Sequence, residues 1–177
     1  MAMTLIERIQ KAVEHGVVAR HRYFETIVLP DEQMLGSPAS IDQVEALERV
    51  LGQNLPPSYR AFLLLFNGWH MVDGGTDLFP VEELLPVEAR NSAVKWQRLS
   101  GASGDEIVER SLLIGGSSIT PTKYLLDPCQ VNEEGEWAFI QHHIEVEAVL
   151  PSFLQWLEES VEEYEELTRA AIGDDGA

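Results

Sequence analysis

The sequence is poor in cysteine, in long apolar runs and in basic residues, and each shortage excludes a class of protein. Its single cysteine, Cys129, excludes an internal disulfide and a zinc site built from several thiolates, and is compatible with a reducing cytosol. The longest apolar run, Ala61 to Phe66, is far shorter than the ~20 residues that cross a bilayer. Charged Glu7, Arg8 and Lys11 occupy the place of a secretory signal's apolar segment. We therefore expect a soluble, cytoplasmic protein.

Basic residues number only 12 against 30 acidic ones, for a formal net charge of −18. The imbalance is concentrated after residue 80, where 20 acidic residues accompany six basic ones. Such a field repels nucleic acids and anionic membranes, so neither is expected as a partner, and it speeds the encounter with a basic protein. Two interpretations stay open: the charge steers a basic partner, or it only keeps the protein soluble.

The densest apolar stretch, residues 55–69, predicts a central, largely buried helix in a chain of 177 residues, which is long enough for one domain with a substantial core. Pro56 and Pro57 suit the first turn of a helix, where a missing N–H leaves no partner unsatisfied. Gly68 suits its end. Apolar residues at helical spacing then define one face of this helix, namely Tyr59, Phe62, Leu63 and Phe66.

Further helices are predicted from capping boxes, in which a Ser or Thr and a Glu or Gln three residues later satisfy each other's backbone N–H groups. Thr4 with Glu7 predicts a short amphipathic helix over 4–15 that ends at Gly16. Ser40 opens a helix that Gly52 closes, and the short connection to the central helix makes the two a hairpin. Ser152 opens the closing helix, in which Phe153 begins an apolar face.

Short β-rich segments between turn signals predict an antiparallel sheet. The strand candidates are Trp69 to Val72, the return through Leu78 and Phe79 after an Asp-Gly-Gly turn, Leu112 to Ile114, Tyr124 to Leu126, and Trp137 to Ile140. Residues 82–100 are predicted to be helical. A β-rich patch over 17–36 could be an added edge strand, a partner contact or a loose arm.

The predicted fold class is α+β, an antiparallel sheet packed against a helical hairpin and a C-terminal helix. We divide the chain into an N-terminal helix and extended arm over 1–38, a domain over 39–168 and a disordered tail over 169–177. The last residues, 173–177, are glycine-rich and acidic, which favours disorder at a chain end.

The pattern E..LG..LPPSYR.FL...NG, from Glu48 to Gly68, resembles the signature of the SUKH superfamily, which includes fungal cell-wall assembly regulators and bacterial immunity proteins. The segments LFPVEEL at 78–84, IGG and YLLD within 114–127, and PSFLQWLEE at 151–159 keep the family's order. The resemblance covers about residues 38–160. It implies a SUKH-like fold and a binding protein rather than an enzyme, in a family whose members share a scaffold and differ in what they bind.

Catalytic and metal-binding constellations are few in this sequence. Cys129 could act as nucleophile with His142 or His143 as base, but nothing orients such a pair. Candidate cation ligands around the glycine turn lack the alternating oxygen ligands of an EF-hand loop; they are His70, Asp73 and Asp77. We therefore expect no enzymatic activity, no metal and no cofactor.

The leading hypothesis from the resemblance and the charge is an immunity protein that neutralises a cognate bacterial toxin by direct binding. A nuclease toxin is expected, because nucleases carry basic surfaces that hold phosphates. The alternative is an intracellular scaffold or regulator of the cell-wall assembly type. Partner contacts are expected on carboxylates of loops beside the sheet, with a partly exposed Trp69 and His70 as anchors. The complete set is Trp69, His70, Asp73, Asp77, Glu82, Glu83, Glu133, Glu134 and Glu136.

Overall fold

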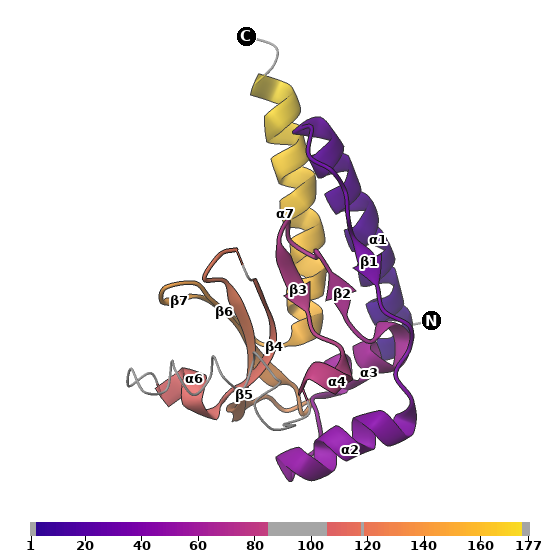
Figure 1. Cartoon of the computed structure of the whole chain (residues 1–177), viewed down its shortest axis with the longest axis vertical. Coiled ribbons are helices and arrows are strands. Elements are labelled where there is room, and N and C mark those ends of the chain that lie inside the picture. The colour runs from indigo at the N-terminus through magenta and orange to yellow at the C-terminus, as the bar shows by residue number, and fades with distance from the viewer. Residues whose placement is uncertain (1–2, 85–105, 118, 175–177) are drawn as a thin grey trace.

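The computed structural model describes residues 3–84, 106–117 and 119–174, and the strands in these ranges form one antiparallel sheet of seven strands that follow one another in sequence order (Figure 1). The strands are β1 (Met34–Leu35), β2 (Trp69–His70), β3 (Thr76–Leu78), β4 (Leu112–Ser117), β5 (Lys123–Val131), β6 (Trp137–His142) and β7 (Val146–Leu150). The helices are α1 (Leu5–Thr26), α2 (Ile41–Leu51), α3 (Pro57–Phe66), α4 (Val81–Leu84), α6 (Glu106–Arg110) and α7 (Phe153–Asp174). Within the described ranges, no helix combines the length and the apolar character needed to cross a bilayer.

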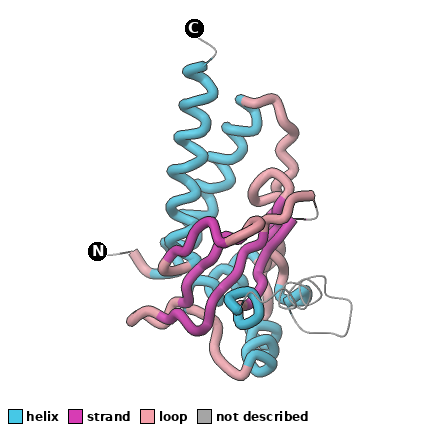
Figure 2. The backbone as a smooth tube through the Cα atoms, turned by 90° about the vertical axis from the view of Figure 1, so that its left-hand side faces the viewer, coloured by secondary structure: helices cyan, strands magenta, loops and turns pink. Residues whose placement is uncertain are grey.

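Helices α1 and α7 lie side by side behind the sheet, run in the same direction and project beyond it (Figures 1 and 2). Together with α3 they cover one face of the sheet and form the main core with it, in which Leu63, Phe139 and Phe153 are fully buried. On the other face, Val108 of α6 packs with a smaller cluster of strand residues, Leu113, Leu125 and Ile140. The predicted α+β fold, with its antiparallel sheet, helical hairpin and C-terminal helix, is confirmed.

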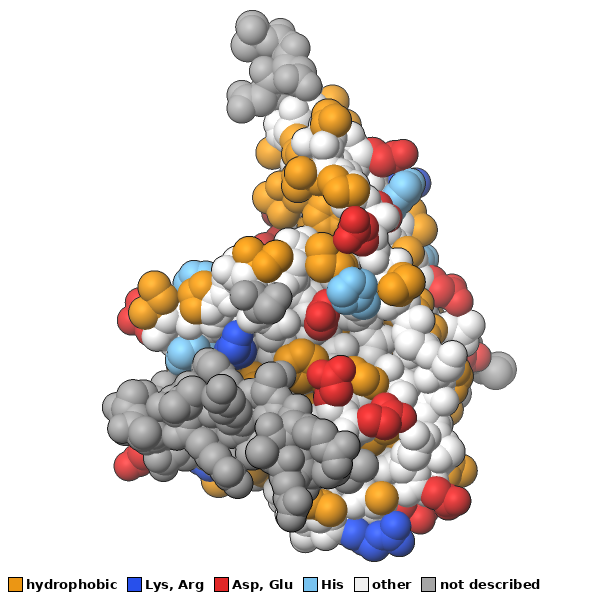
Figure 3. Space-filling model, in the orientation of Figure 1, with side chains coloured by type: hydrophobic (Ala, Val, Ile, Leu, Met, Phe, Trp, Pro, Cys, Tyr) orange, Lys and Arg blue, Asp and Glu red, His pale blue; other side chains and the backbone are white. Residues whose placement is uncertain are grey.

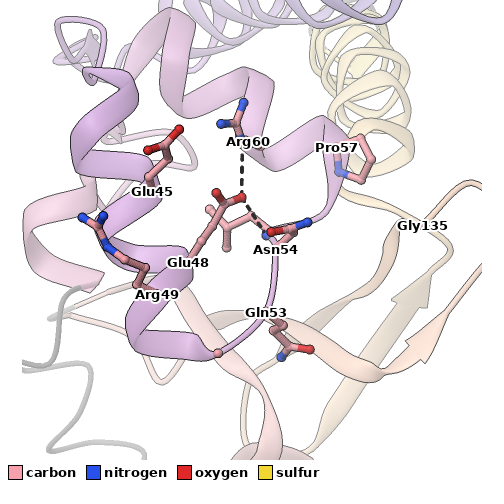
Figure 4. Close-up of a pocket in the computed structure, with 10 residues that line it drawn as sticks. Glu45, Glu48, Arg49, Gln53, Asn54, Pro57, Arg60 and Gly135 are labelled. Carbon is pink, nitrogen blue, oxygen red and sulfur yellow. Dashed lines mark hydrogen bonds and ion pairs between the residues drawn. The ribbon is translucent and has the colours of Figure 1, made fainter.

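The α2–α3 hairpin follows the sequence prediction closely. The Ser40 capping box is formed, and Gly52 ends α2 in the left-handed region with φ of 70°. A single carboxylate then holds the two helices together: Glu48 Oε1 accepts hydrogen bonds from the Leu55 N–H at 3.0 Å and from Arg60 Nε at 3.2 Å (Figure 4). The Glu and Arg of the family pattern are therefore structural residues here.

Helix α1 corrects two predictions, because it continues ten residues beyond Gly16 and ends at Thr26. Gly16 does not stop the helix. A Cβ there would lie 3.0 Å from a guanidinium nitrogen of Arg20 and 3.1 Å from the ring of Trp69, so glycine makes room for side chains that pack against it. The first half of the β-rich patch predicted over 17–36 is helical, and only β1 within the patch is a strand, at the edge of the sheet.

The C-terminal helix also exceeds its prediction, since α7 reaches Asp174 and disorder is wrong for residues 169–174. Their Arg, Ala and Ile residues can extend a helix that packing has already begun. Strand β7 was not predicted. The helix predicted over 82–100 is described only as far as Leu84, the end of α4, and the rest lies outside the described residues. The division of the chain at residue 39 stays a prediction.

Val28 occupies a position that favours glycine, at the end of α1. Its φ is 57°, and the Leu29 N–H donates to the Phe24 carbonyl at 2.9 Å, the bonding pattern of a left-handed C-terminal cap. The Val28 side chain is 88% exposed, so its removal sacrifices little packing. Because a β-branched residue is strained in this region, Val28→Gly should raise the free energy of unfolding by roughly 0.5 to 1 kcal/mol in chemical denaturation.

Val18 gives the matched control for this substitution, because it is 47% exposed and lies within α1. Glycine inside a helix raises the entropic cost of folding, so Val18→Gly should lower the free energy of unfolding by about 0.5 kcal/mol or more. The two substitutions are chemically identical, and their sites differ in backbone conformation and in exposure. If both substitutions changed the free energy of unfolding in the same direction, the proposed backbone strain at Val28 would be contradicted.

Candidate functional site

Strands β1, β2 and β3 turn one set of side chains toward the core and the other toward solvent. Trp69 pairs with Leu78, and both face the core with 1% of their surface exposed. Leu35, which pairs with Trp69 from the edge strand, is still 38% exposed. The alternate row, which includes Met34 and His70, faces outward. Outward-facing residues of these three strands form the surface on which we place the candidate site.

A groove lies on this outer face, beside a point where two backbone segments approach each other closely at Gly36 and Gly68. The Gly36 N–H donates to the Gly68 carbonyl at 3.0 Å. A Cβ on Gly36 would lie 2.3 Å from the Asn67 carbonyl oxygen, and Gly68 has φ of 103°, so neither position tolerates another residue. The groove has a volume of about 560 Å³. Apolar residues that line it include Met34, Pro38, Phe79 and Pro80.

Four polar residues at the groove carry most of its charge, and all four belong to the predicted contact set: His70, Asp77, Glu82 and Glu83. His70 Nδ1 lies 2.8 Å from Asp77 Oδ1, which also accepts from the Met71 N–H at 2.8 Å. Glu82 accepts hydrogen bonds from the side chains of Gln43 in α2 and Asn67 at the end of α3. Figure 3 views this face, where acidic side chains and a histidine lie among apolar ones.

Glu83 is the exception in this set, since its carboxylate makes no hydrogen bond or ion pair to any residue that the structure describes. Partial burial, with the charges of Asp77 and Glu82, raises the pKa of the Glu83 carboxyl above its ordinary value. The groove therefore combines apolar walls with a concentration of negative charge that its own described residues do not neutralise.

Two predicted contact residues, Trp69 and Asp73, belong to the core instead. Trp69 is only 1% exposed, which corrects its assignment as an exposed anchor. Asp73 Oδ1 lies 3.1 Å from Nη2 of Arg20, a side chain with no exposed surface. The hydroxyls of Tyr124 and Tyr164 also donate to Asp73, and the Arg20 guanidinium lies 4.9 Å from the Trp69 ring centre. We call these five residues the Arg20 cluster.

Burial explains the protonation of the two phenols in this cluster. Desolvation, followed by the negative charge of Asp73, raises the pKa of both Tyr124 and Tyr164, so each stays neutral and donates its proton to the carboxylate. The Arg20 cluster joins α1 and α7 to β5 and to the turn between β2 and β3. Its charges are satisfied internally, which leaves Asp73 with a structural role.

Glu136 also has a structural role, because it is only 5% exposed and caps α3 from another part of the chain. The Ser58 N–H donates to Glu136 Oε1 at 2.8 Å, and the Ser58 hydroxyl donates to Oε2 at 2.6 Å. Pro56 precedes the helix without a side-chain cap of its own. Burial raises the pKa of the Glu136 carboxyl, although the two hydrogen bonds oppose this effect.

Glu133 and Glu134 are exposed on the turn between β5 and β6, and neither lines the groove. Gly135 of the same turn lines a different cavity, of about 910 Å³, beside the α2–α3 hairpin (Figure 4). The charged groups of Glu48 and Arg60 in that cavity are already bound to each other. Five of the nine predicted contact residues thus line the groove, the buried Trp69 and the four charged or titratable residues named above, whereas Glu133 and Glu134 lie elsewhere.

Residues 3–84, 106–117 and 119–174 also bear on metal binding and catalysis. No cluster of three or more His, Cys, Asp or Glu side chains suited to a metal ion occurs among these residues. The Ser117 hydroxyl accepts from the N–H groups of Ile119 and Thr120, which makes it part of the loop between β4 and β5. Cys129 is an exposed free thiol.

Sequence reasoning missed the residues that shape the groove, above all Gly36, Gly68 and Phe79. The sequence predicts Gly68 as a helix stop, which is locally sound, and places Gly36 at the end of the β-rich patch over 17–36. Their pairing across 32 positions of sequence depends on β1 joining β2. A two-residue strand such as β1 has no periodic pattern that could reveal it.

An acidic groove with apolar walls on an outer sheet face has the chemistry expected of one class of protein, the protein-binding modules. Comparison with known families supports this class: residues 38–159 match the SMI1 / KNR4 family (SUKH-1), and the chain belongs to that family. The family supports a non-catalytic, protein-binding role for its members. A search of curated proteins found no match to the chain.

Proposed function

We propose that this protein is an immunity protein, which neutralises a cognate bacterial toxin in the cytoplasm by binding it directly. The observation that carries the proposal is the groove on the outer face of β1 to β3, because apolar walls and carboxylates occur there together. A net charge of −18 adds a long-range attraction for a basic partner. A nuclease toxin fits this chemistry, since its phosphate-binding surface is basic.

Affinity capture from a lysate of the source organism, with this chain as bait, tests the proposal directly. Retained proteins are washed at low and then at high salt and identified by mass spectrometry. We expect one basic polypeptide, retained less well as salt screens the charges, whose purified form degrades nucleic acid until this chain is added. Several weak partners without toxic activity would instead favour a regulatory protein of the cell-wall assembly type.

Charge reversal at the groove tests where the partner binds. The double variant Glu82→Lys/Glu83→Lys should weaken binding to the captured toxin at least about tenfold in a titration, because it replaces attraction by repulsion. The control Glu162→Lys/Glu165→Lys makes the same change of net charge on α7, behind the sheet. Equal losses of affinity in the two variants would show that only net charge matters and that the groove is not the contact. The free energy of unfolding is measured for both.

A further inference from the structure

The groove has the form of a receptor for one flat, cationic side chain. Its lining includes the backbone at Gly36 and Gly68, two segments that glycine allows to approach closely. Phe79 and Pro38 line it with apolar surface, whereas Asp77 and Glu83 supply negative charge. A long side chain with an apolar stem and a charged end would contact both kinds of surface at once.

Two carboxylates of the groove have oxygens that no described residue occupies. Asp77 uses Oδ1 to accept from the Met71 N–H and to bind His70, and none of the described hydrogen bonds reaches its Oδ2. Glu83 has neither oxygen bonded to a residue that the structure describes. Glu82, in contrast, is held on both oxygens by Gln43 and Asn67. Among the described residues, the acceptor oxygens without a partner thus belong to Asp77 and Glu83.

Guanidinium suits these surroundings better than ammonium or a metal ion. It is planar and weakly hydrated, so its faces can lie against apolar walls, and its N–H groups form a fork that matches a carboxylate. Ammonium is compact and strongly hydrated, and loses more on leaving water. A divalent ion needs several converging oxygen ligands, and no suitable group occurs in the described part of the chain.

We propose that the groove receives an arginine side chain of the partner, with its stem and flat faces against Phe79 and Pro38 and its N–H groups on Glu83 and Asp77. This inference rests on the proposed function in taking a basic protein as the partner. The inference goes further by naming arginine as the side chain of the partner that the groove binds. An arginine at the centre of the interface would be a principal source of binding energy, as buried arginines often are.

The direct test uses a blocked tripeptide, acetyl-Gly-Arg-Gly-amide, titrated into the full chain at low salt and followed by NMR. The matched probe replaces arginine by citrulline, which has nearly the same shape and no charge, and a third contains lysine. We expect saturable shifts of the Gly36, Gly68 and His70 amide signals with the arginine probe, with a dissociation constant on the order of millimolar. Weaker binding of lysine and none of citrulline should follow. Equal binding of arginine and lysine, or no saturation by arginine, would overturn the inference.

Substitution of one carboxylate locates the charge that is recognised. Glu83→Gln preserves size and should weaken the arginine probe about tenfold, the effect of losing a charge-assisted contact. Glu165→Gln on α7 removes the same charge elsewhere and should change the affinity little. An unchanged affinity in Glu83→Gln, or an equal loss in Glu165→Gln, would refute the assignment.

The outcome separates this inference from the proposed function. The tripeptide titration needs no toxin, so a saturating arginine probe supports the groove assignment even where affinity capture yields a partner that is not a toxin. Conversely, a captured toxin whose affinity is indifferent to Glu83→Gln would support the immunity function and refute the arginine receptor. Citrulline exchange at single arginines of the purified partner then identifies the inserted side chain.

Discussion

Asp73→Ala is expected to lower the free energy of unfolding by roughly 3 to 5 kcal/mol, the effect of breaking a buried ion pair on one side. The loss would leave the guanidinium of Arg20, which has no exposed surface, without its counterion. It would also deprive the hydroxyls of Tyr124 and Tyr164 of their acceptor. Denaturant unfolding followed by circular dichroism measures the change.

A double-mutant cycle with Arg20→Leu provides the control for this prediction. Once the guanidinium is absent, removal of Asp73 no longer leaves a buried cation unpaired, so the double variant should lose less than the sum of the two single changes. Additive losses would mean that the two residues act independently. A loss below about 1 kcal/mol in Asp73→Ala would indicate that Asp73 is free for a partner, as the sequence first suggested.

Leu63→Ala is expected to cost about 2 to 5 kcal/mol of unfolding free energy, because it opens a cavity in the main core. Leu63 has no exposed surface and lies in α3, which packs against α1, α7 and α2. Leu64→Ala is the matched control in the same helix. Leu64 is only partly buried, so the same truncation should cost clearly less. Equal losses of unfolding free energy at Leu63 and Leu64 would contradict the central position of α3 in the core.

Capping residues, glycines and prolines in the sequence correctly predicted those helices whose ends depend on residues nearby in the chain. The Ser40 capping box, Gly52 and the prolines before α3 specify the helical hairpin without reference to the rest of the chain. Gly16 shows the limit of this reasoning. Gly16 leaves room for Trp69, a residue more than fifty positions away, to pack against α1. Only the folded chain shows that α1 continues past Gly16.

The candidate site was harder to predict than the fold because its geometry depends on contacts between distant segments. The sequence marked His70, Asp77, Glu82 and Glu83 through their charge and their place near turns. It gave no reason to separate them from Asp73 and Glu136, which have the same chemistry. Asp73 and Glu136 differ from the groove residues because residues far away in sequence bind them: Arg20 binds Asp73, and Ser58 binds Glu136.

The Arg20 cluster also bears on the order in which the chain can fold. The hydrogen bond from Arg20 to Ser160 spans 140 residues, whereas each strand of the sheet pairs with the next strand in sequence. During synthesis the hairpins can therefore form while α1 has no α7 to contact, and the contact of longest range must wait. We expect the docking of α7 to be the slow, closing step, and α1, made first, to be the segment that most needs protection from aggregation until that step occurs.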